Sequence, residues 1–194
     1  MMFGQSGRAG LGVRAALLGA GCLSAVVATS GVSAVAATQS TARPAVASPS
    51  KCGRNPAHNS HLTRATMQQR GKSWLGKVWY SESSYYCNQY GRYRQDCSGY
   101  VSMAWGLSTS YWTGTLVNVS KRIKRSQLRP GDALIHNPQS TATGHVAMFI
   151  KWANKAHTEP VVWEESHTGT KAGQTTWSVS YANTFYPIRY KNVK

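Results

Sequence analysis

One short segment of the sequence combines the residue types that thiol chemistry needs. Asp96 precedes Cys97, Ser98 and Gly99, and apolar residues then recur at three- and four-residue spacing over 100–107. This periodicity predicts an amphipathic helix with Asp96 as its N-cap. A cysteine attacks as a thiolate, and the free N–H groups of a first helical turn favour a negative sulfur. Cys97 is therefore the candidate nucleophile, and the backbone N–H groups of Cys97 and Ser98 are candidate donors to an oxyanion.

A general base for this cysteine must come from elsewhere in the chain. His145 follows Gly144 and opens the strongly apolar segment 145–152, so we expect a rigid strand to hold its imidazole. His136, at the end of a shorter apolar segment, is the second candidate. The other histidines lie in polar stretches, at His58, His61, His157 and His167.

A third group usually orients the imidazole of such a pair. Glu164 and Glu165 follow the apolar segment 161–163, in a chain with only six acidic residues. Because side chains alternate along a strand, only one of the two would face His145. The spacing leaves open which one it is, and His167 is a weaker candidate.

The pattern of helices and strands changes along the chain. We expect a helix over 61–76, interrupted near Gly71, and a second over 97–107. Segment 79–95 is rich in Tyr, Ser, Asn, Gly and Arg, which predicts an irregular loop. Strands are expected over 133–135, 145–152, 161–163, 176–181 and 187–190. Helices followed by a run of antiparallel strands indicate an α+β fold.

The N-terminal residues have the order of a secretory signal. Basic residues precede a weakly apolar run that ends in the small-x-small pattern of 34–36. We expect a signal peptide over 1–37, a linker or N-terminal segment over 38–60 and one domain over 61–194. The protein would then be secreted, and either extracellular or associated with the cell wall, without stable membrane insertion after cleavage.

Charge and cysteine content agree with an exported protein. The chain has 22 Lys and Arg against six acids, a net charge of +16, which favours anionic partners. No zinc-finger or ribonucleoprotein motif points to nucleic acid, so an anionic cell envelope is the simplest partner. Cys52, Cys87 and Cys97 follow the expected cleavage site, and an odd number leaves one thiol over. Cys52 and Cys87 could pair in their polar surroundings, although the other pairings stay open.

Cofactors and metals are not expected. Cys52, His58 and His61 do not have the spacing of a common zinc site. The sequence has no phosphate-binding glycine loop, and its few acids argue against a glycosidase carboxylate pair.

Three segments in sequence order resemble the NlpC-type family of cell-wall cysteine peptidases. They are DCSGYV at 96–101, PGDAL at 130–134 and GHVAMFI at 144–150, and the resemblance extends over about 62–190. It implies a papain-like α+β fold, with N-terminal helices packed on an antiparallel β-sheet, and a Cys-His-polar triad. It also implies cleavage of amide bonds in peptidoglycan stem peptides, commonly next to D-glutamate. The residues that it places at the substrate are Tyr80, Asp96, Ser98 and Gly144.

The sequence departs from this family in two places. Many members have His as the third residue, whereas this chain offers Glu164, favoured by the strand end, or Glu165, favoured by alignment with the related CHAP amidases. Tyr80 is followed by the polar segment 81–84 instead of Gly-Gly, which predicts a differently shaped cleft.

Together these features predict a secreted cysteine hydrolase that cleaves amide bonds in peptidoglycan by a Cys97–His145–Glu triad. We expect it to be a monomer that binds peptidoglycan and anionic wall polymers. Two alternatives remain: a non-catalytic cationic wall-binding module on the same scaffold, and a thiol hydrolase or transferase acting on proteins or small amides.

Overall fold

A computed structural model describes residues 51–194, so the expected signal peptide and the first part of the expected linker lie outside the described residues. The helices are α1 (Arg64–Lys72), α2 (Cys97–Trp105), α3 (Thr113–Leu116) and α4 (Val179–Ala182), with 3-10 turns η1 (Val117–Val119) and η2 (Arg125–Gln127). The strands are β1 (Ser81–Asn88), β2 (Gly91–Gln95), β3 (Ser120–Arg122), β4 (Ala133–His136), β5 (His145–Trp152), β6 (Pro160–Glu164), β7 (Gly173–Thr176) and β8 (Tyr186–Tyr190).

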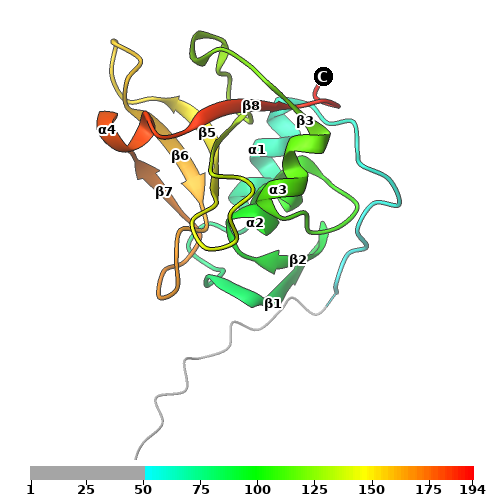
Figure 1. Ribbon diagram of the computed structural model, residues 1–194. Helices are drawn as coiled ribbons and strands as arrows, with labels where there is room; N and C mark the ends of the chain where they lie inside the picture. The colour runs from blue at the N-terminus through cyan, green and yellow to red at the C-terminus, as the bar shows by residue number, and fades with distance from the viewer. Residues whose placement is uncertain (1–50) are drawn as a thin grey trace, which may run out of the picture. The chain divides into compact units, whose positions relative to one another are not determined.

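The strands form two antiparallel sheets. β1 and β2 make a hairpin, and the other six strands are ordered β3-β8-β4-β5-β6-β7. Figure 1 shows α1, α2 and α3 grouped beside the six-stranded sheet and α4 at its other side. The predicted α+β class, with helices packed on an antiparallel sheet, is confirmed.

Helix α2 is the central element of the fold, and all nine of its residues are buried. The Asp96 carboxylate accepts a hydrogen bond from the Gly99 N–H at 2.7 Å, so the predicted N-cap is confirmed. Gly106 ends the helix with a φ of 65°, a left-handed conformation that glycine adopts without strain. Helix α2 therefore has a fixed start, which fixes the position of Cys97.

The central sheet is buried on both faces. Along β5, Val146 and Met148 join the apolar core that includes α1 and α2, whereas Ala147 and Phe149 join a second core with Trp177. This alternation places His145 on the same face as Ala147 and Phe149. The second core thus covers the face of the sheet from which the imidazole projects.

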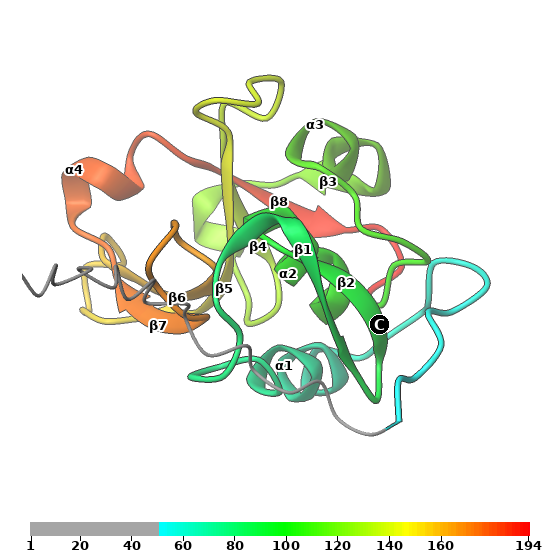
Figure 2. The same ribbon diagram turned by 90° about the horizontal axis from the view of Figure 1, so that it is seen from below.

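The expected loop over 79–95 is wrong, because most of this segment forms the β1-β2 hairpin. The segment has no regular alternation of apolar and polar residues. The hairpin is instead stabilised by individual contacts. Tyr93 is fully buried and donates its hydroxyl to the Leu107 carbonyl at 2.6 Å, and the Cys52–Cys87 disulfide joins β1 to the N-terminal segment. Figure 2 shows the hairpin running alongside α2.

The expected strand over 176–181 is also wrong in its extent. β7 ends at Thr176, and Ser178 then caps α4 by accepting a hydrogen bond from the Tyr181 N–H. The first expected helix is shorter than predicted, since α1 ends at Lys72, and Gly71 lies within it. A Cβ at Gly71 would lie 2.7 Å from the Met148 side chain, so this glycine allows α1 to approach the sheet closely.

The segment before α1 is fastened to the rest of the described chain. Cys52 pairs with Cys87, which leaves Cys97 as the free cysteine among residues 51–194. Leu62 pairs with Val193 in a parallel bridge, so the residues just before α1 lie beside the C-terminal segment. Within the same residues, no helix is both long and apolar enough to cross a membrane.

Candidate active site

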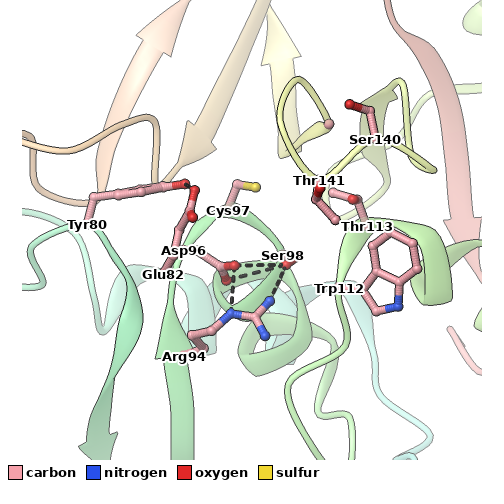
Figure 3. Close-up of a pocket in the computed structure, with 11 residues that line it drawn as sticks. Tyr80, Glu82, Arg94, Asp96, Cys97, Ser98, Trp112, Thr113, Ser140 and Thr141 are labelled. Atoms are coloured by element: carbon pink, nitrogen blue, oxygen red, sulfur yellow. Dashed lines mark hydrogen bonds and ion pairs between the residues drawn. The ribbon is translucent and has the colours of Figure 1, made fainter.

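Cys97 is the first residue of α2 and lines a cleft of about 240 Å³. Only 5% of the residue is exposed, so solvent or a substrate reaches the sulfur from the cleft alone. We name this hollow the Cys97 cleft; it is lined by Tyr80, Glu82, Arg94, Asp96, Cys97, Ser98, Trp112, Thr113, Ser140, Thr141 and Gly144. Figure 3 shows the sulfur pointing between Tyr80 on one side and Thr141 on the other.

His145 makes a hydrogen bond with Glu164, and Cys97 lies close enough to its ring to raise its pKa. Its Nε2 is 2.8 Å from Glu164 Oε2, which leaves Nδ1 for the thiol. The position of His145 as the first residue of β5 fixes the ring, because the strand is paired on both sides. Glu164 ends the neighbouring strand β6. Three elements, α2, β5 and β6, therefore bring these three side chains together.

The electrostatics of this group favour a protonated imidazole. Burial lowers the pKa of His145, but the hydrogen bonds and negative charges of Cys97 and Glu164 outweigh it and raise the pKa to about 9. Burial raises the pKa of Glu164, but the hydrogen bond and positive charge of His145 and the hydrogen bond from Trp177 outweigh it and lower the pKa. At neutral pH the surroundings of His145 thus favour an imidazolium beside the Glu164 carboxylate.

Glu164 is held on both of its oxygens. Its Oε2 contacts His145, and its Oε1 accepts the indole N–H of Trp177 at 3.0 Å. Trp177 also packs against Phe185, with ring centroids 4.3 Å apart, and both rings flank His145 at about 6 Å. This aromatic wall excludes water from the His145–Glu164 contact, which strengthens it.

The structure brings Glu164 and not Glu165 to His145. Glu165 is fully buried on the opposite side, where its charge and, more strongly, burial raise the pKa of Tyr100. His136, the second candidate base, is the cross-strand partner of His145 and points its Nδ1 at the Thr184 carbonyl at 2.8 Å. His167 is exposed in the loop between β6 and β7. Of the two glutamates, Glu164 thus faces His145 and Glu165 faces Tyr100, as the alternation of side chains along a strand predicts.

A charged network forms one wall of the Cys97 cleft. Arg94 Nε donates to Asp96 Oδ2 at 2.7 Å, and its Nη2 donates to the Ser98 hydroxyl at 3.0 Å (Figure 3). Asp96 is therefore both the N-cap of α2 and the partner of a cleft-lining cation. A Cβ at Gly99 would lie 2.0 Å from the Arg94 carbonyl oxygen. The glycine is therefore required by the contact between α2 and β2, in addition to any effect on substrate access.

Two aromatic side chains stand on opposite sides of the cleft. Tyr80 donates its hydroxyl to Glu82 at 3.0 Å, so a carboxylate lies where the family pattern has glycine. Trp112 is 37% exposed, and its ring covers Gly114, where a Cβ would lie 2.2 Å from the indole. Figure 3 shows Trp112 across the cleft from Tyr80. Gly144 lines the remaining side, where a Cβ would lie 2.3 Å from the Ser140 carbonyl oxygen.

The sequence did not identify several residues of this region, among them Arg94, Trp112, Ser140 and Trp177. Arg94 had a signal, because an arginine two residues before the capping Asp96 can fold back onto its carboxylate. The sequence signal for Trp112 is weaker: it is the nearby Gly114, over which the indole ring packs. Ser140 lies four residues before Gly144, in a polar loop without a catalytic pattern, and Trp177 lies beyond β7, 13 residues after Glu164. Within residues 51–194, no group of three or more His, Cys, Asp or Glu could hold a metal ion.

Solved structures with a similar fold include two NlpC/P60 proteins. A Staphylococcus aureus protein of the NLP/P60 family is 15% identical over 70% of this chain and 43% of that chain, with a TM-score of 0.49. RipD from Mycobacterium tuberculosis, described as a non-catalytic NlpC/p60 domain protein adapted to peptidoglycan binding, is 18% identical over 67% and 98%, with a TM-score of 0.42.

A third similar structure is the resuscitation promoting factor interacting protein RipA, 20% identical over 66% of this chain, with a TM-score of 0.46. The chain spans 61% of the length of that structure. No family model matches the chain, and no curated protein matches its sequence. At these identities and TM-scores, the chemistry has to be argued from the chain's own residues.

Proposed function

We propose that this chain is a cysteine hydrolase that cleaves amide bonds in peptidoglycan stem peptides. The observation that supports it most is the placement of His145 beside Cys97 and in hydrogen-bond contact with Glu164, at the wall of a cleft. A nucleophile, a base and an orienting acid in that order are what covalent acyl transfer needs.

In the first step, the Cys97 sulfur attacks the carbonyl carbon of the scissile amide. The carbonyl π electrons move to its oxygen, and the tetrahedral oxyanion collapses to a thioester as the C–N bond breaks. His145 gives its proton to the departing amine. The first N–H groups of a helix have no partner within the helix, so those of Cys97 and Ser98 can donate to the oxyanion.

In the second step, water replaces the amine. The neutral His145 takes a proton from the water as the oxygen attacks the thioester, and the acid product leaves as the thiolate re-forms. Glu164 keeps the ring in place throughout and stabilises the imidazolium whenever His145 is charged. Trp177 and Phe185 keep this contact dry.

The Cys97 cleft suits a short, charged peptide. It exposes the cation Arg94 on one wall and the carboxylate of Glu82 on another, with Tyr80 and Trp112 as apolar surfaces. Stem peptides carry free amines and carboxylates close to their amide bonds, which these groups can pair with. Tyr80, Asp96, Ser98 and Gly144 are the substrate-contacting residues of the proposal, and secretion to the wall is part of it.

The test is digestion of purified cell walls, followed by the release of new amino groups. We expect wild-type protein to release them and Cys97→Ala and His145→Ala to be inactive, with Ser166→Ala, an exposed residue beyond β6, as the control. Digestion by Cys97→Ala at the wild-type rate would refute the proposal. Cleavage of a peptide made only of L-residues, without action on walls, would instead favour a hydrolase of proteins or small amides.

A second candidate function is retention on the wall without turnover. Residues 51–194 carry 19 Lys and Arg against six acids, a net charge of +13 (19 − 6), and four of those acids are buried. A surface this cationic binds anionic polymers whether or not Cys97 reacts. Wall binding that is salt-sensitive, together with no release of amines by the wild type, would favour this function.

A further inference from the structure

A second hollow, of about 260 Å³, is lined almost entirely by cations. We name it the cationic cavity; its residues are Arg64, Lys121, Arg129, Arg189, Tyr190, Lys191, Val193 and Lys194. They come from the start of α1, from β3, from the turn before β4, from β8 and from the C-terminal residues. Figure 1 shows β3 and the end of β8 beside the C-terminus. Segments far apart in sequence thus bring their positive charges to one place.

One buried carboxylate organises this cavity. Asp132 is 1% exposed and receives Arg64 at 3.0 Å and Arg189 at 2.8 and 2.9 Å, as well as the Arg129 N–H at 2.8 Å. These bonds use both carboxylate oxygens and fix the two guanidinium groups. Two arginines on one carboxylate still leave a positive charge at the surface.

The lysines of the cavity are held by backbone hydrogen bonds, and the Lys191 ammonium also donates to the Asn118 carbonyl at 2.8 Å. The Lys191 N–H bonds the Val119 carbonyl at 3.0 Å, and the Lys194 N–H bonds the Leu62 carbonyl at 2.9 Å. Lys121 lies in β3, paired with Arg189 of β8. Even without Lys194, five cations face the single acid Asp132, a net charge of +4 (5 − 1). The mutual repulsion of these like charges destabilises the empty cavity, and a bound anion relieves it.

The cavity lies at the opposite end of α2 from the Cys97 cleft. Trp105, the last residue of α2, stacks on the cavity residue Tyr190 with centroids 5.3 Å apart, whereas Cys97 is the first. A helix of this length spans roughly 13 Å. A ligand in the cavity would therefore leave the cleft open.

We propose that the cationic cavity binds the phosphate groups of a linear phosphodiester polymer of the cell wall, of the teichoic acid type. Arginines and lysines together recognise phosphate; Arg64 and Arg189 already donate to Asp132, so the Arg129 guanidinium can offer paired N–H groups and the lysines act as point charges. The disulfide and the expected export signal favour a wall polymer over nucleic acid. Binding would hold the molecule on the wall without a separate binding domain.

The test measures binding of synthetic poly(glycerol phosphate), which has no amide bond, so the result is independent of the proposed hydrolysis. Full-length Lys121→Gln/Lys191→Gln is compared with Lys77→Gln/Lys155→Gln, which removes the same charge from exposed residues outside the cavity. We expect the cavity pair to weaken binding about tenfold and to flatten its salt dependence, and the control pair to change it little. Thermal unfolding of each variant verifies that it folds.

Three results would overturn the proposal. Equal losses in the two double variants would mean that binding follows net charge alone. Equal affinity for poly-glutamate would remove the preference for phosphate, and tighter binding of single-stranded DNA with the same number of phosphates would make the occupant a nucleic acid.

Discussion

His145 is the central residue of the proposed reaction, because it lies beside the thiol and contacts the orienting acid. Its raised pKa of about 9 means that the imidazolium persists through neutral pH. The stabilisation that this charge gives to the fold is fully present below the ordinary pKa of 6.5 and is lost as the pH rises through about 9. The proton that the leaving amine needs is lost over the same range.

We therefore expect the hydrolysis rate to fall above about pH 9, as His145 loses its proton. Glu164→Gln keeps the size of the side chain and removes its negative charge, so the alkaline fall should move to lower pH and the rate should drop at least tenfold. Rates of amine release from wall fragments over a pH series measure both effects. An alkaline limb that is the same in Glu164→Gln would contradict the assigned contact.

Trp177 is a positioning residue, since it acts on the reaction only through Glu164. We expect Trp177→Phe, which keeps the apolar packing and removes the indole N–H, to lower kcat, leave KM nearly unchanged and shift the alkaline limb. The lost hydrogen bond should cost about 1 kcal/mol of unfolding free energy. Trp163→Phe is the matched control, because Trp163 also lies against β7 but donates to Gln174 at 3.0 Å. Equal kinetic effects of both changes would remove the positioning role.

At the scale of elements, the start of α2 is set by its contact with β2. A Cβ at Gly99 would meet the Arg94 backbone at 2.0 Å, and a backbone atom cannot rotate away as a side chain can. We expect Gly99→Ala to lower the unfolding free energy by about 1–3 kcal/mol and to displace Cys97. Gly173→Ala, where the nearest atom is 3.4 Å away, should be nearly neutral in the same denaturant titration. A neutral Gly99→Ala would show that the α2–β2 contact is loose.

Elements with a regular pattern of apolar residues could be predicted from the sequence. Elements stabilised by individual long-range contacts could not. β5 was placed residue by residue, and α2 was placed to within its last turn, because both have a regular apolar pattern and α2 has a clear cap. The β1-β2 hairpin has no such pattern and depends on the disulfide and on Tyr93, which no local rule reveals. Ser178 falls within the expected strand 176–181, but Ser is a preferred N-cap, and in the structure it caps α4.

The candidate site could be predicted only in part for a related reason. Cys97 and His145 open regular elements, so their types and neighbours identify them. The choice between Glu164 and Glu165 depends on the register of β6 against β5, which contains an irregularity between Phe149 and Lys151. One residue of slip exchanges the two faces, and sequence alone does not fix it.

At the scale of the molecule, the acids and cations are used differently. Of the six acids, Asp96, Asp132, Glu164 and Glu165 are buried, where Asp96 and Asp132 organise arginines and Glu164 holds His145. Among residues 51–194, only Arg64, Arg94 and Arg189 of the lysines and arginines form an ion pair with Asp96 or Asp132. Four of the six acids thus have structural or catalytic positions inside the fold. The surface is left positive and can contact anionic material.

The disulfide supports the whole described fold and not the reaction. It joins residues 35 positions apart, so Cys52→Ser/Cys87→Ser should lower the unfolding free energy by roughly 2–4 kcal/mol. The folded double variant should keep the wild-type rate of wall digestion below its melting temperature. Denaturant titration and digestion of the same sample measure the two effects. Loss of activity in the folded variant would mean that the hairpin shapes the cleft more than its contacts suggest.

The most direct measurement of the central claim is the rate of iodoacetamide labelling at pH 6, with the labelled cysteine identified by peptide mapping. Without reduction, we expect Cys97 alone to label, faster than a free thiol, because the His145 imidazolium stabilises the thiolate beside it. His145→Ala should remove this acceleration. Labelling of wild-type Cys97 no faster than a free thiol would contradict the catalytic account and leave wall binding as the function that the surface charge supports.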